Sequence, residues 1–209
     1  MKKTILHILA VGVFVTLLSG CAANYRPINV SNVNYPAVEK KNGLELAFKY
    51  DVLREAGNKK MAKKEGNSSK KVVAIKLTNN TDSDLVIGRD MFFFAGQTKI
   101  NPSQPQEMKM AIKQNVAGYL PYGLLTLMKL TITKDFQTSV YSIGYVIGPL
   151  VTIFNMTTAS GSNKRFEKNL KEYSLIDKTV KKGETIFGLM GVSEPGFQAI
   201  TVKLKSEIE

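Results

Sequence analysis

The sequence predicts a mainly β fold, a β-sandwich that an apolar helical insertion interrupts. Short segments with alternating apolar and polar residues occur in both halves of the chain, and Gly, Asn and Pro turns separate them. Two long, nearly uncharged runs lie between these halves. An apolar content of 44% is enough for a sizeable core. We therefore expect one domain at 42–209, with the insertion at about 106–173.

The N-terminus has the layout of a secretory signal peptide. Lys2 and Lys3 supply positive charge, an apolar run from Ile5 to Leu18 follows, and small residues end it. The run has about fourteen residues, fewer than the roughly twenty that a bilayer-spanning helix needs. We expect residues 1–20 to be removed as a signal peptide, and the alternative is an uncleaved anchor helix.

The end of this segment, Leu18-Ser19-Gly20-Cys21, resembles the lipobox of bacterial lipoproteins. In that family a diacylglycerol is attached to the cysteine sulfur, the chain is cut just before the cysteine, and the new amine is usually acylated. The resemblance implies that Cys21 is the lipidated N-terminus and that the membrane of the cell envelope is a partner. Two or three acyl chains would anchor the protein stably, because each buried methylene contributes about 0.8 kcal/mol. Since Ala22 and not Asp follows the cysteine, the sorting rule of the family implies the outer membrane in a Gram-negative source.

The composition argues against catalysis. The chain has one His and one Cys. His7 lies in the signal peptide and Cys21 is the expected lipidation site, so the mature chain would lack an imidazole and a free thiol. This excludes His-based triads, Cys–His nucleophiles and nearly all zinc or copper sites. Its carboxylates are scattered among lysines without a paired arrangement. We expect no enzyme, no catalytic residues, no cofactor and no metal site.

The net charge of +12 raises the question of nucleic acid as a partner. An exported protein meets anionic headgroups or polysaccharide instead, so we expect no nucleic-acid binding. Several lysines gather in one polar segment, which its composition predicts to be a solvated hairpin loop. Contact with a polyanion or a membrane is the functional alternative. These lysines are Lys59, Lys60, Lys63, Lys64, Lys70 and Lys71.

The mature chain begins with a polar, Asn-rich segment. Residues 21–41 contain Pro27 and Pro36, and we expect a lipidated, extended tether, with an edge strand as the alternative. From Leu44 to Val52 apolar residues alternate with polar or small ones, which predicts a half-buried strand.

Further strands follow the lysine-rich segment. Val73, Ile75 and Leu77 alternate with other residues, a turn cluster occupies Asn79–Asp84, and Leu85–Ile87 begins another strand. Two more strands are expected at Phe92–Phe94 and Thr98–Ile100, joined by a hairpin tip at Ala95-Gly96-Gln97.

The C-terminal part, from Thr179, predicts three strands. The first precedes a turn at Gly183, the second runs from Ile186 to Val192, and the third, from Phe197 to Leu204, follows a Pro195-Gly196 turn. The segments AIKLTNNTDSDL and TVKKGETIFGLM resemble the immunoglobulin-like modules of bacterial exported proteins. This resemblance implies an immunoglobulin-like sandwich of an uncharacterised family, although no Cys…Trp…Cys signature is present.

The two uncharged runs form the insertion. Val116–Ile132 contains one charge, Lys129, and Ser139–Ser160 contains none. Three interpretations compete: a packed helical hairpin, a partner-facing or lipid-facing surface, and a membrane span. We favour packing, in which Gly144 and Gly148 permit close backbone approach, because glycines and prolines leave no long unbroken apolar helix. These are Gly118, Pro121, Gly123, Gly144, Gly148 and Pro149.

A helix is expected to return the chain to the sandwich. Ser162 would be its N-cap, and Phe166, Leu170 and Tyr173 at i, i+4 and i+7 would form its apolar face. The pattern Asn163-x-x-Phe166-x-x-x-Leu170 resembles a recurrent arrangement in uncharacterised bacterial lipoproteins, a resemblance that implies no activity.

Two functions from different classes follow from these features. The leading hypothesis is a membrane-anchored, non-catalytic interaction or scaffold module with a protein partner in the envelope. The alternative is the binding of lipid or another apolar ligand through the insertion, at 116–160.

Overall fold

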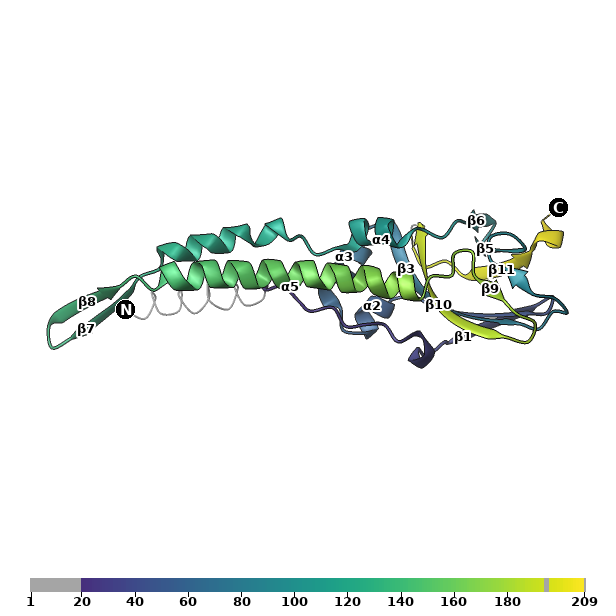
Figure 1. Cartoon of the computed structure of the whole chain (residues 1–209), viewed down its shortest axis with the longest axis horizontal. Coiled ribbons are helices and arrows are strands. Elements are labelled where there is room, and N and C mark those ends of the chain that lie inside the picture. Colours follow the sequence, from purple (N-terminus) through teal and green to yellow (C-terminus); the bar gives the residue numbers. More distant parts are fainter. Residues whose placement is uncertain (1–19, 194–195, 209) are drawn as a thin grey trace. The chain divides into compact units, whose positions relative to one another are not determined.

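The computed structural model describes residues 20–193 and 196–208. The signal peptide, with Leu18 and Ser19 of the lipobox, lies outside the described residues, as does Pro195 of the expected turn. The chain forms two compact units (Figure 1). The described part of unit 1 comprises residues 20–24 and Gln114–Ser162. Unit 2 comprises Tyr25–Lys113 and Asn163 onwards.

Unit 2 contains three antiparallel sheets. The largest has the order β1(Ala37–Lys41), β2(Leu44–Lys49), β3(Lys70–Asn79), β10(Thr185–Ser193). The second has the order β11(Ile200–Leu204), β5(Met91–Ala95), β6(Thr98–Ile100), and β4(Leu85–Val86) pairs with β9(Thr179–Val180). Most of the predicted strands are thereby confirmed, including the β5–β6 hairpin with Gly96 at φ 60° in its tip.

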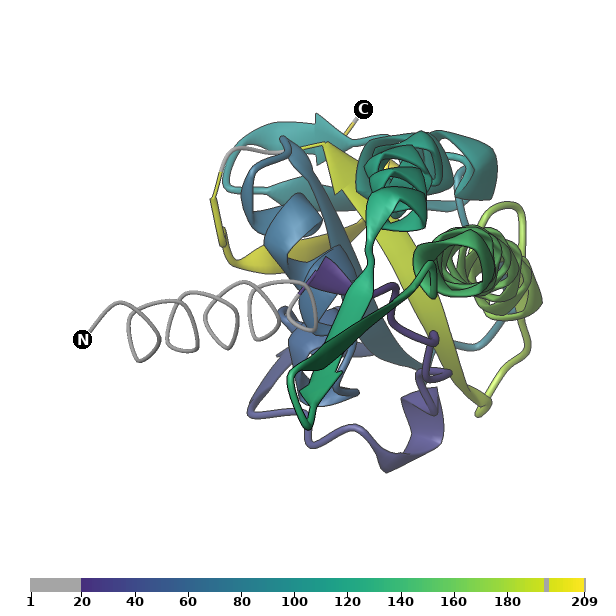
Figure 2. The ribbon, with the colours of Figure 1, turned by 90° about the vertical axis from the view of Figure 1, so that its left-hand side faces the viewer.

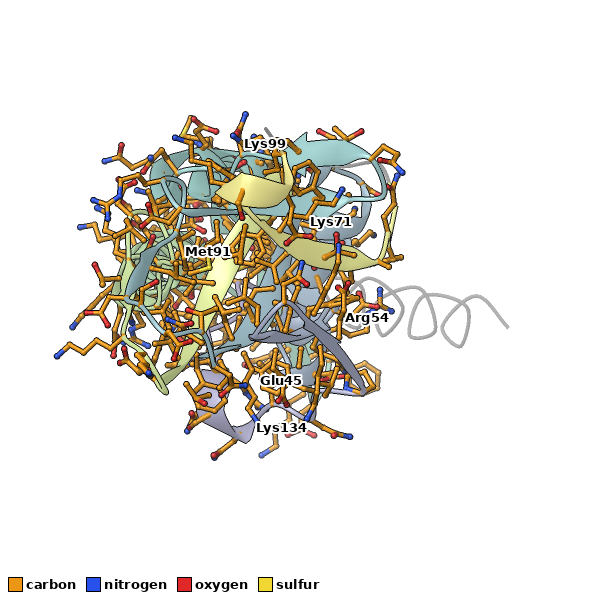
Figure 3. The ribbon with its side chains drawn as sticks, turned by 90° about the vertical axis from the view of Figure 1, so that its right-hand side faces the viewer. Glu45, Arg54, Lys71, Met91, Lys99 and Lys134 are labelled. Carbon is orange, nitrogen blue, oxygen red and sulfur yellow. The ribbon has the colours of Figure 1, made fainter. Side chains whose placement is uncertain are left out.

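Successive side chains of β3 point to opposite faces of its sheet, and both faces are buried. Val73, Ile75 and Leu77 belong to a core shared with the β5 sheet, where Met91 is fully buried (Figure 3). Val72 and Ala74 face a second core. Helices supply most of that second core: α2(Val52–Glu55), α3(Lys59–Gly66), α4(Pro105–Ile112) and the unit 2 part of α5(Gly144–Glu172).

The described residues are about 32% strand and about 36% helix. Several antiparallel sheets are therefore present, as the sequence predicts, but helices have a comparable share, so the expectation of a mainly β fold is too narrow. Four α-helices and three 3-10 helices, η1(Val30–Asn32), η2(Ala117–Leu127) and η3(Lys205–Glu207), occur in the described part of the chain.

The expected tether at 21–41 is folded. Tyr25, Ile28 and Val30 are buried in the second core of unit 2. The Asn169 carboxamide oxygen accepts hydrogen bonds from Tyr25 Oη at 2.6 Å and from the Ile28 backbone N–H at 2.9 Å. Residues 37–41 form edge strand β1, which was the alternative. The segment packs on unit 2 because its few apolar residues reach the second core, although most of its residues are polar.

The lysine-rich segment is helical, so the expected hairpin loop is wrong. Met61, Ala62 and Glu65 form the buried face of α3, while Lys59, Lys63 and Lys64 are exposed. Lys, Met, Ala and Glu all favour helix, and this spacing is that of an amphipathic one.

Unit 1 contains η2, the hairpin of β7(Leu130–Lys134) and β8(Gln137–Tyr141), and the N-terminal part of α5 (Figure 2). The expected insertion is therefore not wholly helical. Threonines and β-branched residues favour strand here, and Asp135 and Phe136, at φ 51° and 64°, form the tight turn. In the described part of the chain, no helix is both long and apolar enough to cross a membrane.

The expected helix start at Ser162 is also wrong, because α5 begins at Gly144. The Ser162 hydroxyl donates to the Ala23 carbonyl at 2.8 Å instead of capping the helix. Phe166 and Leu170 lie buried in unit 2, as their spacing predicts.

Candidate interaction surface

The unit 1 part of α5 has its small residues inside and its large apolar residues outside. The inward positions are Gly144, Gly148, Asn155, Ala159 and Ser162. The outward positions are Tyr145, Val146, Leu150, Ile153 and Phe154, and Leu150 and Phe154 are 62% and 67% exposed. A water-facing helix normally has the opposite arrangement.

Two glycines bring α5 against the end of η2. A Cβ added at Gly148 would lie 2.5 Å from both the backbone N and Oγ1 of Thr126. A Cβ added at Gly144 would meet the backbone of Leu125, Thr126 and Met128. The close backbone approach expected at these glycines is therefore present, and it depends on the missing side chains.

The polar side chains of this stretch bond to the helix itself. Thr152 Oγ1 donates to Gly148 O at 2.8 Å, Asn155 Nδ2 to Val151 O at 2.8 Å, and Thr157 Oγ1 to Ile153 O at 2.9 Å. Such bonds back to the preceding turn satisfy the polar groups without water. The stretch is thus compatible with an apolar environment.

Other outward apolar side chains come from η2, where Leu120, Leu124 and Leu127 are exposed. We call these three, with the five of α5, the apolar surface: Leu120, Leu124, Leu127, Tyr145, Val146, Leu150, Ile153 and Phe154. The packed-insertion interpretation is wrong for these side chains. Because η2 and α5 meet through small residues, their large side chains point outward.

The hairpin that follows η2 is exposed throughout. All ten residues of β7 and β8 are exposed, and Phe136 in the turn is fully so. In the described structure the two strands pair with each other alone. The charged residues of 114–162 gather here: Lys129, Lys134 and Asp135.

Cys21 lies in the same unit as the apolar surface. The Ala22 N–H donates to Asn155 Oδ1 at 2.6 Å, and the Ala23 N–H donates to Gln114 Oε1 at 3.1 Å. Gln114 Nε2 returns a 2.6 Å hydrogen bond to the Ala23 carbonyl. Burial raises the pKa of Tyr122, and the neighbouring Cys21 raises it further. Of the predicted lipobox, Gly20 and Cys21 are described, and both lie in unit 1 beside η2.

The six predicted lysines do not form one surface. Lys59, Lys63 and Lys64 are exposed on α3, and Lys60 is half-buried there. Lys70 Nζ instead donates to Ser193 Oγ at 2.6 Å and to Ser103 Oγ at 2.9 Å. Lys70 is half-buried and Lys71 is buried, so these two lysines of β3 differ from the exposed lysines of α3.

The Lys71 ammonium has a structural role. Its Nζ donates to the carbonyl of Glu65 at 2.7 Å and to that of Ser68 at 2.8 Å. It therefore holds the end of α3 to the start of β3. A functional role for Lys70 and Lys71 as free cations has no support in these contacts.

Glu65 is a buried carboxyl that sequence reasoning missed. Its Oε1 accepts a 2.6 Å hydrogen bond from the Val72 N–H. Burial raises its pKa from 4.5 to about 7, although the Val72 hydrogen bond and Lys71 act in the opposite direction. A carboxyl with such a pKa can serve catalysis, but the contacts here are those of an α3–β3 junction.

Two cavities at the cores of unit 2 are small, whereas an open surface pocket measures about 290 Å³ and is lined by Gln104, Pro105, Gln106, Lys171 and Ser174. The cavity beside Met108, Leu170 and Leu189 measures about 10 Å³, and that beside Phe93 and Ile100 about 80 Å³. Ligand pockets are commonly about 300 Å³ or larger. No three His, Cys, Asp or Glu side chains come together as a metal site in the described residues.

Comparison with known proteins found no match: no family model fits the sequence, and neither a curated protein nor a solved structure is similar to it.

Proposed function

We propose that this chain is an exported bacterial lipoprotein, anchored through acyl chains on Cys21, that acts as a non-catalytic interaction module in the cell envelope. The lipobox resemblance supports the anchor. The observation that carries the proposal is the 2.6 Å hydrogen bond from Ala22 to Asn155, which holds the expected lipidation site to the unit that exposes the apolar surface. The Ala22 residue supports sorting to the outer membrane.

The finer fold assignment is part of this proposal. An immunoglobulin-like sandwich for unit 2 is supported by the β3 sheet and the β5 sheet, which share one core. The helices on the other face of the β3 sheet are an addition to that arrangement.

A second candidate function is the binding of lipid or another apolar ligand through 116–160. The exposed apolar surface favours it, because soluble monomers rarely expose a large contiguous apolar patch.

Metabolic labelling with a clickable fatty acid tests the anchor. Wild-type protein should incorporate the label, and Cys21→Ser should not. Ala22→Asp should keep the label but leave the outer-membrane fraction, if the sorting rule applies. Equal labelling of wild type and Cys21→Ser would refute the anchor. Crosslinking in labelled cells, with mass spectrometry of proteins and lipids, then distinguishes a protein partner from a bound lipid.

A further inference from the structure

We propose that the apolar surface of unit 1 lies in the interface of the lipid leaflet, where it holds the protein to the membrane together with the acyl chains of Cys21. This deepens the proposed function and rests on it for the choice of leaflet and for the acyl chains beside the surface. The lipid contact itself follows from the side chains of η2 and α5.

The packing of unit 1 is that of helices in lipid. Within its described residues, η2 and α5 meet through Gly144, Gly148 and Thr126, and the large side chains face outward. In membranes, helices associate through small residues that let backbones approach, while large apolar side chains face the acyl chains. In water the outward Leu and Phe side chains would lose the free energy of burial.

The electrostatics of the outward face also fit lipid better than a soluble partner. From Gly144 to Asn163 there is no charged side chain, and the hydroxyl groups of Thr152 and Thr157 bond to carbonyls of α5. A protein interface usually has a polar rim that supplies hydrogen bonds across it. This face offers few, and the hydroxyl groups of Thr152 and Thr157 are already satisfied within the helix.

The hairpin determines how deeply unit 1 can enter the lipid. The outer edges of β7 and β8 carry backbone groups that lipid cannot satisfy, and Lys129, Lys134 and Asp135 need water or headgroups. The hairpin must therefore stay at the polar boundary. Unit 1 then lies along the interface, with its apolar side chains buried about 5–10 Å into the boundary between headgroups and acyl chains.

Continuity with the anchor supports the same occupant. The backbone of Ala22 and Ala23 is bonded to Asn155, Gln114 and Ser162. Acyl chains on Cys21 would begin within two residues of these contacts. A bilayer that receives those chains is then next to the apolar surface.

The test uses the full mature chain with Cys21→Ser, so that no acyl chain contributes. Phosphatidylcholine vesicles are the probe, because their zwitterionic surface removes the attraction of the lysines. The chain contains no tryptophan, so Leu150→Trp gives a single fluorescent reporter in the apolar surface. Phe197→Trp is the control, because Phe197 is 61% exposed in unit 2.

We expect Leu150→Trp to show blue-shifted emission on vesicle addition, with stronger quenching by lipids brominated near the headgroup than by lipids brominated near the chain end. Phe197→Trp should not respond. Stronger quenching from the chain end would overturn the interfacial placement. No response from Leu150→Trp would overturn the lipid contact, and a vesicle-independent shift with self-association would assign the surface to a second copy of the chain.

A pair of aspartate substitutions measures how much the apolar surface contributes to vesicle binding. Leu150→Asp with Phe154→Asp should lower vesicle partitioning by more than about tenfold. Met110→Asp with Phe197→Asp, at residues 63% and 61% exposed in unit 2, should leave it unchanged. Circular dichroism establishes that both pairs are folded. Equal losses in the two pairs would overturn the proposal.

The two proposals fail separately. If Cys21 is not acylated but the Cys21→Ser protein binds vesicles, the anchor is refuted and the surface stands. If Cys21 is acylated but the Cys21→Ser protein does not bind, the surface is refuted and the anchor stands.

Discussion

The backbone N–H of Ala22 donates a 2.6 Å hydrogen bond to Oδ1 of Asn155, a side chain that is 1% exposed. The same side chain donates through Nδ2 to the Val151 carbonyl at 2.8 Å. Asn155 thus uses both ends of its carboxamide, one for its own helix and one for the N-terminal segment. The expected lipidation site is therefore followed immediately by fixed backbone, and the acyl chains on Cys21 would leave from a defined place on unit 1.

Replacing this asparagine should release the N-terminal segment. Asn155→Ala leaves the Ala22 N–H without its acceptor; because this bond is part-buried, the cost is at most the roughly 1–3 kcal/mol of a fully buried group. We expect a lower urea midpoint and faster proteolysis after residue 21 in the Cys21→Ser protein. Thr157→Ala is the control, because its hydroxyl bonds within the exposed face of α5. Equal behaviour of the two variants would contradict a fixing role for Asn155.

Alanine at two glycines of α5 should have opposite effects. Gly148→Ala places a methyl group 2.5 Å from Thr126, so η2 must move, and overpacking of this kind typically destabilises by about 1–3 kcal/mol. At Gly161 an added Cβ meets nothing within 4 Å. Gly161→Ala should therefore stabilise the helix, by about 0.5–1 kcal/mol.

Thermal unfolding of both glycine variants checks this prediction. The midpoint should fall for Gly148→Ala and rise for Gly161→Ala. A fall of the same size in both would mean that glycine is needed along the whole helix and not at the contact with η2.

The pKa of Glu65 predicts a pH dependence of stability. Its value of about 7 lies above the 4.5 of an accessible glutamate. Between these values the folded protein keeps the proton that the unfolded chain releases, so the stability contributed by this carboxyl is complete below about pH 4.5 and is lost as the pH rises through about 7. The effect is at most about 3 kcal/mol.

Glu65→Gln tests this, since its amide stays neutral and keeps an oxygen for the Val72 N–H. Between about pH 5 and about pH 8, which lie on either side of the raised pKa of about 7, the variant should lose less stability than wild type in denaturant unfolding. Glu172→Gln, which changes an exposed residue of α5, should follow wild type. Parallel pH profiles for wild type and Glu65→Gln would contradict the raised pKa.

The exposed lysines of α3 should contribute electrostatic attraction to anionic membranes. Each lysine near such a surface contributes about 1 kcal/mol, so neutralising three should weaken binding to phosphatidylglycerol vesicles by about a hundredfold. Binding to phosphatidylcholine should not change. The variants are Lys59→Gln, Lys63→Gln and Lys64→Gln together, and the control set is Lys178→Gln, Lys181→Gln and Lys182→Gln.

High salt distinguishes this attraction from apolar contact. Salt screens charges beyond a Debye length of about 8 Å at physiological ionic strength. Wild-type binding to phosphatidylglycerol should fall with salt toward that of the α3 variant. A salt-independent difference between them would mean that the lysines act through structure.

Much of the strand content was predictable, because period-two alternation identifies a half-buried strand by itself. Val73, Ile75 and Leu77 fixed the position of β3, and the glycine turns fixed its partners: Gly183, at φ 74°, precedes β10. Helices α2 and α3 were missed for a different reason, whereas the part of α5 that carries Phe166 and Leu170 was expected. In α3 the lysines dominate the composition, but Met61 and Ala62 determine the buried face.

The surface of unit 1 could not be predicted, because a helix with small and large apolar residues has the same composition whichever side faces inward. Gly144 and Gly148 indicated close packing, and this is confirmed. Which face then points outward depends on the partner element, η2, whose 3-10 geometry no pattern indicated. The hairpin was not predicted because it lies between two apolar runs that were read as helical. Asp135, which favours a turn, and Thr131, which favours a strand, did indicate it.

The most direct test of the whole account is the mass of the N-terminal peptide of the protein purified from bacterial membranes. The account predicts a peptide that begins at Cys21 and carries a diacylglycerol on sulfur, with or without an acyl group on the amine. A peptide that still contains Leu18-Ser19-Gly20 before an unmodified Cys21 would contradict it.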